Sequence, residues 1–149
     1  MQTPPFSSSH RSKWGTREGK ISLISALIAL IVIFNLFYLG AKPVAVGLFP
    51  EPWDKLAHFL VFSLLTALFW IATDGRFGVF IVLAVSLIGA ADEIHQIFLP
   101  GRSAGLDDLA ADIIAALTMF WLLHWLRKLT AKTRSPDPQS EAIVENINR

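Results

Sequence analysis

The chain of 149 residues contains no cysteine. Disulfides, thiolate catalysis and cysteine-based zinc sites are therefore excluded. The sequence also lacks a glycine-rich phosphate loop, an internal repeat and a coiled-coil pattern. The formal net charge is only +1, which gives no indication of a nucleic-acid partner, and we expect none.

Long apolar runs are what the sequence does contain. Hydrophobic residues make up 53% of the chain, and the mean hydropathy is +0.50. The first of these runs, residues 21–40, would be about 30 Å long as a helix at roughly 1.5 Å per residue, which matches the thickness of a bilayer core. We predict an all-α bundle of four transmembrane helices at about residues 21–40, 55–73, 77–99 and 108–128, between tails at 1–19 and 130–149.

Basic residues predict how these helices are oriented. Nine lysines and arginines lie in segments 11–20 and 127–134 and in the turn between the second and third runs, against three in the other two connections. Because basic residues favour the cytoplasmic side, both termini are predicted to be cytoplasmic. No small-residue cleavage site follows the first run, so we expect it to stay in place as a membrane helix.

The most informative segment is Ala90–Arg102, which places ionisable side chains at the outer end of the third run. Asp92, Glu93 and His95 lie there within an otherwise apolar stretch, before a Pro-Gly pair that is expected to stop the helix. Ionisable groups inside a membrane helix are costly and mark by default a functional site that faces protein or water.

Polar residues of two other helices are predicted to reach the same depth. In the second helix, Asp54 and His58 are four residues apart and share a face. In the fourth helix, Asp108 and Asp112 repeat this spacing. The candidate polar site comprises Asp54, His58, Asp92, Glu93, His95, Gln96, Arg102, Asp108 and Asp112. Four of these side chains are predicted to meet in one cluster: His58, Asp92, Gln96 and Asp112.

Ordinary structural roles compete with this interpretation. Asp54 is a suitable N-cap for the second helix, and Asp107, which we leave outside the candidate site, is a suitable cap for the fourth. Arg102 can pair with a nearby acid or anchor at lipid headgroups. Asp112 can form a structural pair with Arg102 or with His58.

Four short motifs, taken in order, resemble the signature of the VanZ-like membrane proteins: Asp54-Lys55-x-x-His58-Phe59, Asp92-Glu93-x-x-Gln96, Pro100-Gly101-Arg102 and Asp108. The resemblance covers about residues 53–123. It implies a bacterial membrane protein related to an accessory factor of glycopeptide (teicoplanin) resistance, and it implies no particular reaction. The family usually has Asn and then spaced glycines where this chain has Asp112, Ala116 and Met119, so we do not expect close glycine packing of the fourth helix.

Several kinds of chemistry fit the expected cluster. Carboxylates with one or two imidazoles beside them can hold a hard divalent cation through oxygen ligands, and together with Lys55 and Arg102 such a site can bind a phosphate or diphosphate headgroup. Clustered acids can also perform acid–base catalysis, although no nucleophile elbow or His-Glu-x-x-His zinc motif is present. A proton or ion path and a structural network that joins the helices are the remaining alternatives.

Together with the resemblance, the sequence therefore predicts a four-helix protein of the bacterial inner membrane with an outward-facing polar pocket. We expect an accessory or binding factor in the handling of envelope lipids or glycans, or in glycopeptide tolerance. The alternative is a membrane-embedded hydrolase or transferase that acts on a lipid-linked phosphate at the outer face. The expected partners are the lipid bilayer and an envelope lipid or glycan, and a divalent cation is the candidate cofactor. The sequence does not define the metal or the oligomeric state.

Overall fold

The computed structural model describes residues 17–48, 50 and 52–133, and these residues form helices and no strand. The four long helices are α1 (Arg17–Gly40), α2 (Trp53–Thr73), α3 (Gly78–Ile97) and α4 (Leu106–Thr133), and a short 3-10 helix, η2 (Pro43–Ala45), follows α1. Each long helix has the length and the apolar composition needed to cross a membrane. The predicted all-α fold is confirmed.

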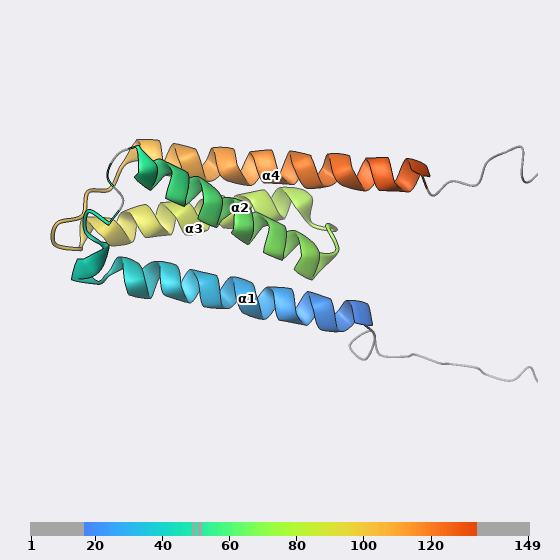
Figure 1. The fold of residues 1–149 in the computed structure, drawn as a ribbon, viewed down its shortest axis with the longest axis horizontal. Coiled ribbons are helices and arrows are strands. Elements are labelled where there is room, and N and C mark those ends of the chain that lie inside the picture. The colour runs from blue at the N-terminus through green and yellow to red at the C-terminus, as the bar shows by residue number, and fades with distance from the viewer. Residues whose placement is uncertain (1–16, 49, 51, 134–149) are drawn as a thin grey trace, which may run out of the picture.

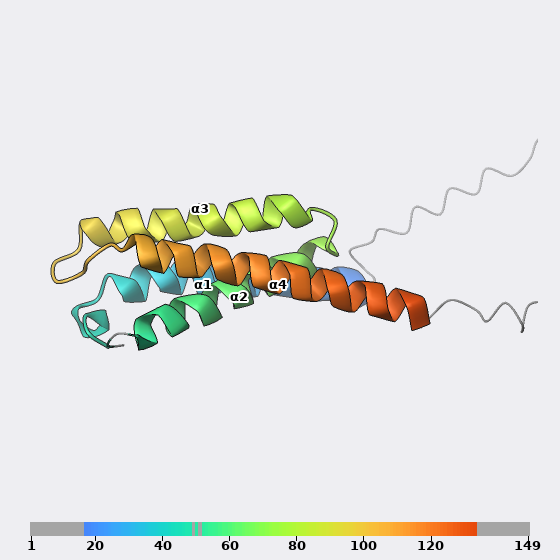
Figure 2. The same ribbon diagram turned by 90° about the horizontal axis from the view of Figure 1, so that it is seen from above.

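The long helices run alternately up and down, as Figure 1 shows. The α1–α2 and α3–α4 connections lie at one end, which we call the loop end. The start of α1, the α2–α3 turn and the end of α4 lie at the opposite end, which we call the terminal end. The most extensive packing is between α2 and α4; α4 also packs on α3, and α1 packs mainly on α2 (Figure 2).

The core is narrow, and most apolar side chains point outward. Phe62 and Leu65 of α2, Val85 of α3 and Ala115 and Ala116 of α4 are fully buried. The two alanines allow α4 to approach its neighbours closely, because small residues bring helix backbones together in membranes. The remaining surface carries large exposed apolar side chains along all four helices, which is the exterior that a hydrocarbon environment requires.

Several helix ends differ from the prediction. Residues 17–19 and 130–133, which we expected in the tails, belong to α1 and α4. The apolar runs underestimate the lengths of these two helices, because arginine, lysine and glutamate end an apolar run but are good helix formers. Both α2 and α4 begin two residues earlier than predicted, and α3 ends two residues earlier. The rest of the predicted tails, 1–16 and 134–149, lies outside the described residues and includes three of the counted basic residues.

The end of α3 explains how the α3–α4 connection folds back over the bundle. The backbone N–H groups of Phe98 and Leu99 donate to the carbonyls of His95 and Gln96 at 3.1 and 3.0 Å, which closes the last turn before the Pro-Gly pair. Gly101 has a φ of 80°, a left-handed conformation that favours glycine. The chain therefore reverses here and leads back towards the start of α4.

Candidate functional site

The ionisable residues singled out from the sequence lie at the loop end, inside the bundle. His58 lies in the second turn of α2, Asp112 in the second turn of α4, and Asp92 and Glu93 in the last two turns of α3. Because α2 and α4 begin at this end and α3 finishes there, these positions lie at similar depth. We call the four side chains the inner cluster.

An imidazole–carboxylate pair joins α2 to α4 in the inner cluster. Nδ1 of His58 lies 3.0 Å from Oδ1 of Asp112, and Asp112 is completely buried. An ionised carboxylate only accepts hydrogen bonds, so Nδ1 of His58 donates here and Nε2 keeps its lone pair in the neutral ring. The ring of His58 also stacks on buried Phe62 one turn deeper. The imidazole is thus fixed from two sides.

The two acids of α3 are each oriented by one hydrogen bond. Asp92 is 3% exposed and Glu93 is 7% exposed. The side-chain amide of Gln96 donates to Oδ2 of Asp92 at 2.9 Å. The backbone N–H of Gly105, in the α3–α4 connection, donates to Oε2 of Glu93 at 2.7 Å. One acid is therefore positioned by its own helix and the other by the connection that covers the loop end.

The inner cluster brings negative charge together without a matching cation. One ligating atom from each of His58, Asp92 and Glu93 lies within 4.8 Å of the other two. No lysine or arginine among the described residues forms an ion pair with Asp92 or Glu93. Oε1 of Glu93 and Oδ2 of Asp112 are buried without a hydrogen-bond partner in the described part of the chain. A buried polar atom left in this way costs about 1–3 kcal/mol.

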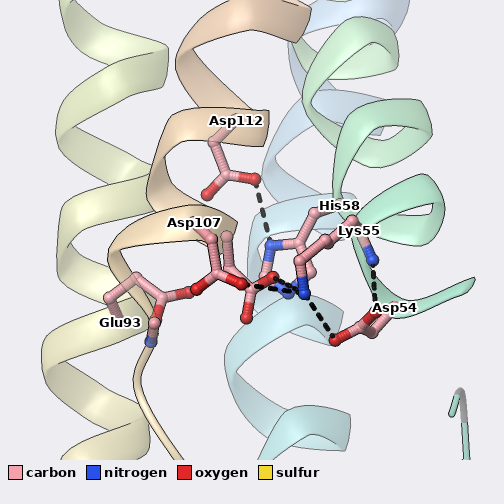
Figure 3. A network of polar contacts seen from close by, with 8 residues as sticks. Asp54, Lys55, His58, Glu93, Asp107 and Asp112 are labelled. Carbon is pink, nitrogen blue, oxygen red and sulfur yellow. Dashed lines mark hydrogen bonds and ion pairs between the residues drawn. The ribbon is translucent and has the colours of Figure 1, made fainter. Parts of the chain in front are cut away.

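A second polar group, centred on Lys55, forms the rim of the site (Figure 3). Nζ of Lys55 lies 2.8 Å from Oδ2 of Asp107. It also lies 3.6 Å from Oδ2 of Asp54 and 3.8 Å from Oδ1 of Asp108. These pairs tie the start of α2 to the start of α4. They are partly exposed, so water screens them and each contributes little to stability.

Two predicted site residues contact other parts of the fold. The ring of His95 packs against Phe37 of α1 with ring centroids 5.4 Å apart. The guanidinium of Arg102 donates through Nη1 to the carbonyl of Ala45 at 3.1 Å. Arg102 makes no ion pair with an acid among the described residues, so it ties the two loop-end connections together instead. Of the two partners predicted for Asp112, the structure therefore shows His58 and not Arg102.

The alternative interpretation of Asp54 as an N-cap is wrong. The N-cap of α2 is Pro52, which makes no side-chain capping bond, and Asp54 lies inside the first turn. Its Oδ1 accepts the backbone N–H of Lys55 at 2.8 Å. Pro52 directly precedes the helix, a position that suits proline because it has no backbone N–H that needs a partner.

Sequence reasoning missed two glycines that shape the site. A Cβ on Gly89 would lie 2.7 Å from Oδ2 and 3.1 Å from Cβ of Asp112, so only glycine at this position leaves room for that carboxylate. Gly105 supplies the N–H that holds Glu93. Close glycine packing is thus present on α3, which the expectation for the fourth helix did not concern. The signal was a Gly-Ala-Ala run immediately before the acidic pair.

Two surface grooves flank the bundle at its opposite ends. A groove of about 550 Å³ lies at the terminal end and is bordered by Glu18, Trp70 and Arg76. A second groove, of about 500 Å³, lies at the loop end and is almost entirely apolar. Its lining comprises Pro50, Trp53, Leu56, Ala57, Leu60 and Val61. This second groove lies along the turns of α2 that carry Lys55 and His58, but neither of these side chains lines it.

Comparison with known proteins agrees with the motifs at the loop end. The family described as VanZ/LLP1 matches residues 3–127, a range that includes the inner cluster, the rim and most of all four helices. No curated protein and no solved structure matches the chain. The matched range far exceeds the four short motifs. The chain is therefore a multi-pass membrane protein that belongs to the VanZ/LLP1 family.

Proposed function

We propose that the protein is an accessory or binding factor that holds an envelope lipid or glycan in the polar site at the loop end. The observation that carries this proposal is the buried carboxylate oxygens of Glu93 and Asp112 that lack a partner among the described residues. A network with only a structural role is expected to satisfy its own polar atoms, as buried groups in native proteins do. Buried carboxylate oxygens without a hydrogen-bond partner in the described residues favour a bound ligand.

An apolar groove at the loop end favours a lipid with a polar head. The groove of about 500 Å³ follows the first turns of α2, on the outward face of that helix, and its lining includes none of the polar side chains of the rim or the inner cluster. An acyl or isoprenoid chain is the kind of ligand that fits such a groove. Lys55 and Arg102 lie at the loop end near the polar side chains, where they offer positive charge to a phosphate group.

The distribution of basic residues favours the outer face of the membrane for this site. If all four helices cross the membrane, the start of α1 and the end of α4 lie on one side of it, and the loop end lies on the other (Figure 1). The described part of the terminal end carries more basic residues than the loop end: Arg17, Lys20, Arg76, Arg127, Lys128 and Lys132 against Lys42, Lys55 and Arg102. By the positive-inside tendency, the loop end faces away from the cytoplasm.

Cysteine labelling tests this orientation. The chain has no cysteine of its own, so a single introduced thiol reports without background. We expect a membrane-impermeant maleimide to label Ser103→Cys in intact spheroplasts and to label Ser135→Cys only after lysis. Labelling of Ser135→Cys from outside, with Ser103→Cys protected, would show that the loop end faces the cytoplasm.

A membrane-embedded enzyme is the second candidate, and the His58–Asp112 pair favours it. A carboxylate that orients an imidazole is the arrangement of a general base, because it fixes the tautomer and stabilises the protonated ring. Such an enzyme would act as a hydrolase or transferase on a lipid-linked phosphate. Turnover distinguishes the two candidates, since an accessory factor retains its ligand unchanged.

Lipids that co-purify with the protein test the binding role. We expect wild-type protein, extracted from bacterial membranes in native lipid, to retain a phosphate-bearing lipid that native mass spectrometry detects in proportion to the chain. Glu93→Gln is expected to lose it. Asp74→Asn is the matched control, because Asp74 lies at the terminal end and asparagine tolerates its left-handed backbone with φ 55°. Identical lipid content in all three proteins would contradict the proposal, and accumulation of a cleaved lipid product would favour the enzyme.

A further inference from the structure

We propose that His58, Asp92 and Glu93 together bind one divalent cation that takes nitrogen and oxygen ligands. The cation site is part of the binding site proposed above and rests on that proposal. One ligating atom of each residue lies within 4.8 Å of the others. Atoms bound to one ion at about 2.1 Å lie at most about 4.2 Å apart, so small side-chain adjustments complete the site.

The open oxygen of Glu93 is the first independent observation that points to an ion. The side chain is 7% exposed, and Oε1 has no hydrogen-bond partner in the described residues. Figure 3 shows the carboxylate of Glu93 directed from α3 towards the side chains of α2 and α4. An anionic oxygen buried without a donor is unfavourable, and a bound cation removes that penalty.

The second observation is that each proposed ligand is held by a separate partner. Asp112 fixes His58 through Nδ1. Gln96 fixes Asp92, and the backbone N–H of Gly105 fixes Glu93. Ligating histidines in metal sites characteristically donate their other ring nitrogen to a carboxylate or carbonyl, which orients the ring and raises its basicity. Here that bond leaves Nε2 of His58 as the ligating nitrogen.

The ligand types limit the class of ion. One imidazole with two carboxylates is not the all-oxygen set that calcium and magnesium prefer, and the chain has no thiolate for soft metals. The set suits Mn²⁺, Fe²⁺ or Zn²⁺. Three protein ligands leave positions open on such an ion. A phosphate oxygen in one of them explains how a cluster rich in carboxylates accepts an anionic lipid headgroup.

Metal titration of the full chain tests the inference. We expect purified protein in detergent, stripped with a chelator, to bind one Mn²⁺ per chain in an electron paramagnetic resonance titration, with a nitrogen coupling from an imidazole in the pulsed spectrum. Zn²⁺ is expected to compete for the same site. His58→Gln, Asp92→Asn and Glu93→Gln are each expected to weaken binding by at least tenfold, and His58→Gln to remove the nitrogen coupling. Asp74→Asn is expected to bind as the wild type does.

Asp112 is a positioning residue for the imidazole, so its variant gives a separate readout. Asp112→Asn is expected to weaken Mn²⁺ binding by about 10–100-fold while the nitrogen coupling remains at saturating metal. Absence of stoichiometric Mn²⁺ or Zn²⁺ binding by folded wild-type protein, or equal binding by the ligand variants, would overturn the cation site. If wild-type protein binds no ion but retains its lipid after chelation, the lipid-binding role stands without the cation. If it binds the ion and no lipid, the cation site stands and the lipid-binding role fails.

Discussion

Neutralising the acidic pair of α3 is expected to abolish the cellular function while leaving the protein folded. Asp92→Asn and Glu93→Gln keep the size of each side chain, and each retains one carbonyl oxygen for the bond from Gln96 or from the N–H of Gly105. What they remove is negative charge from a cluster that has no lysine or arginine paired to it among the described residues. If the cluster holds a ligand through that charge, function is lost.

The measurement is complementation of a deletion strain in an envelope assay, such as sensitivity to a glycopeptide once the outer barrier is bypassed. Protein level and melting temperature are taken from the same preparations, and Asp74→Asn is the matched charge-removing control. A structural network predicts the opposite pattern, because replacing buried ionic groups by neutral ones is often neutral or stabilising. Full activity in both α3 variants would rule out a charge-dependent site at these residues.

Gly89→Ala is expected to destabilise the bundle even though alanine is the better helix former. Propensity favours alanine by about 1 kcal/mol in a helix interior. Against this, the new Cβ would meet Oδ2 of Asp112 at 2.7 Å and its Cβ at 3.1 Å, and overpacking of this kind costs about 1–3 kcal/mol. The steric cost exceeds the propensity gain. We expect a lower melting temperature in detergent and displacement of Asp112 from His58.

Gly40→Ala is the control for that experiment. Gly40 ends α1 and has no heavy atom within 4 Å of the position where a Cβ would stand. We expect its melting temperature to stay close to that of the wild type. A Gly89→Ala protein that is as stable as the wild type would show that α3 and α4 are less closely packed at this position than the Gly89–Asp112 contact requires.

The sequence predicts the fold well because the bilayer imposes a simple rule. A hydrocarbon environment requires every backbone polar group to be paired within the segment, so long apolar runs leave few alternatives to helices. The ends of the helices are harder to predict. The last residues of α4 up to Thr133 are polar and basic, and the polarity that ends an apolar run does not end a helix.

The positions of site residues were predictable where the spacing of residues along a helix determines them. The four-residue spacings place His58 and Asp112 one turn inside their helices, and the structure brings the two side chains together at 3.0 Å. Sequence spacing does not show which way a loop residue turns. Arg102 therefore reached a backbone carbonyl rather than an acid, and the role of Gly105 as a donor became visible only once the connection was placed.

Packing across helices was the least predictable feature. His95 shares the last turns of α3 with the acidic pair but packs on Phe37 of α1, because its position around the helix axis turns it towards a different neighbour. The need for glycine at position 89 likewise depends on which residue of α4 faces it across the helix contact, and that residue is Asp112. Neither follows from the pattern of one helix alone, since both depend on how two helices meet.

A structure of the full chain in native lipid tests the central claim most directly. If the inner cluster is a ligand site, density that is not protein will contact Oε1 of Glu93 and at least one of His58 and Asp92, with an ion at their centre and a lipid headgroup beyond it. If the same carboxylates are instead bonded to Lys55, Arg102 or other protein groups and leave no space between them, the cluster is structural and the proposed ligand site is contradicted.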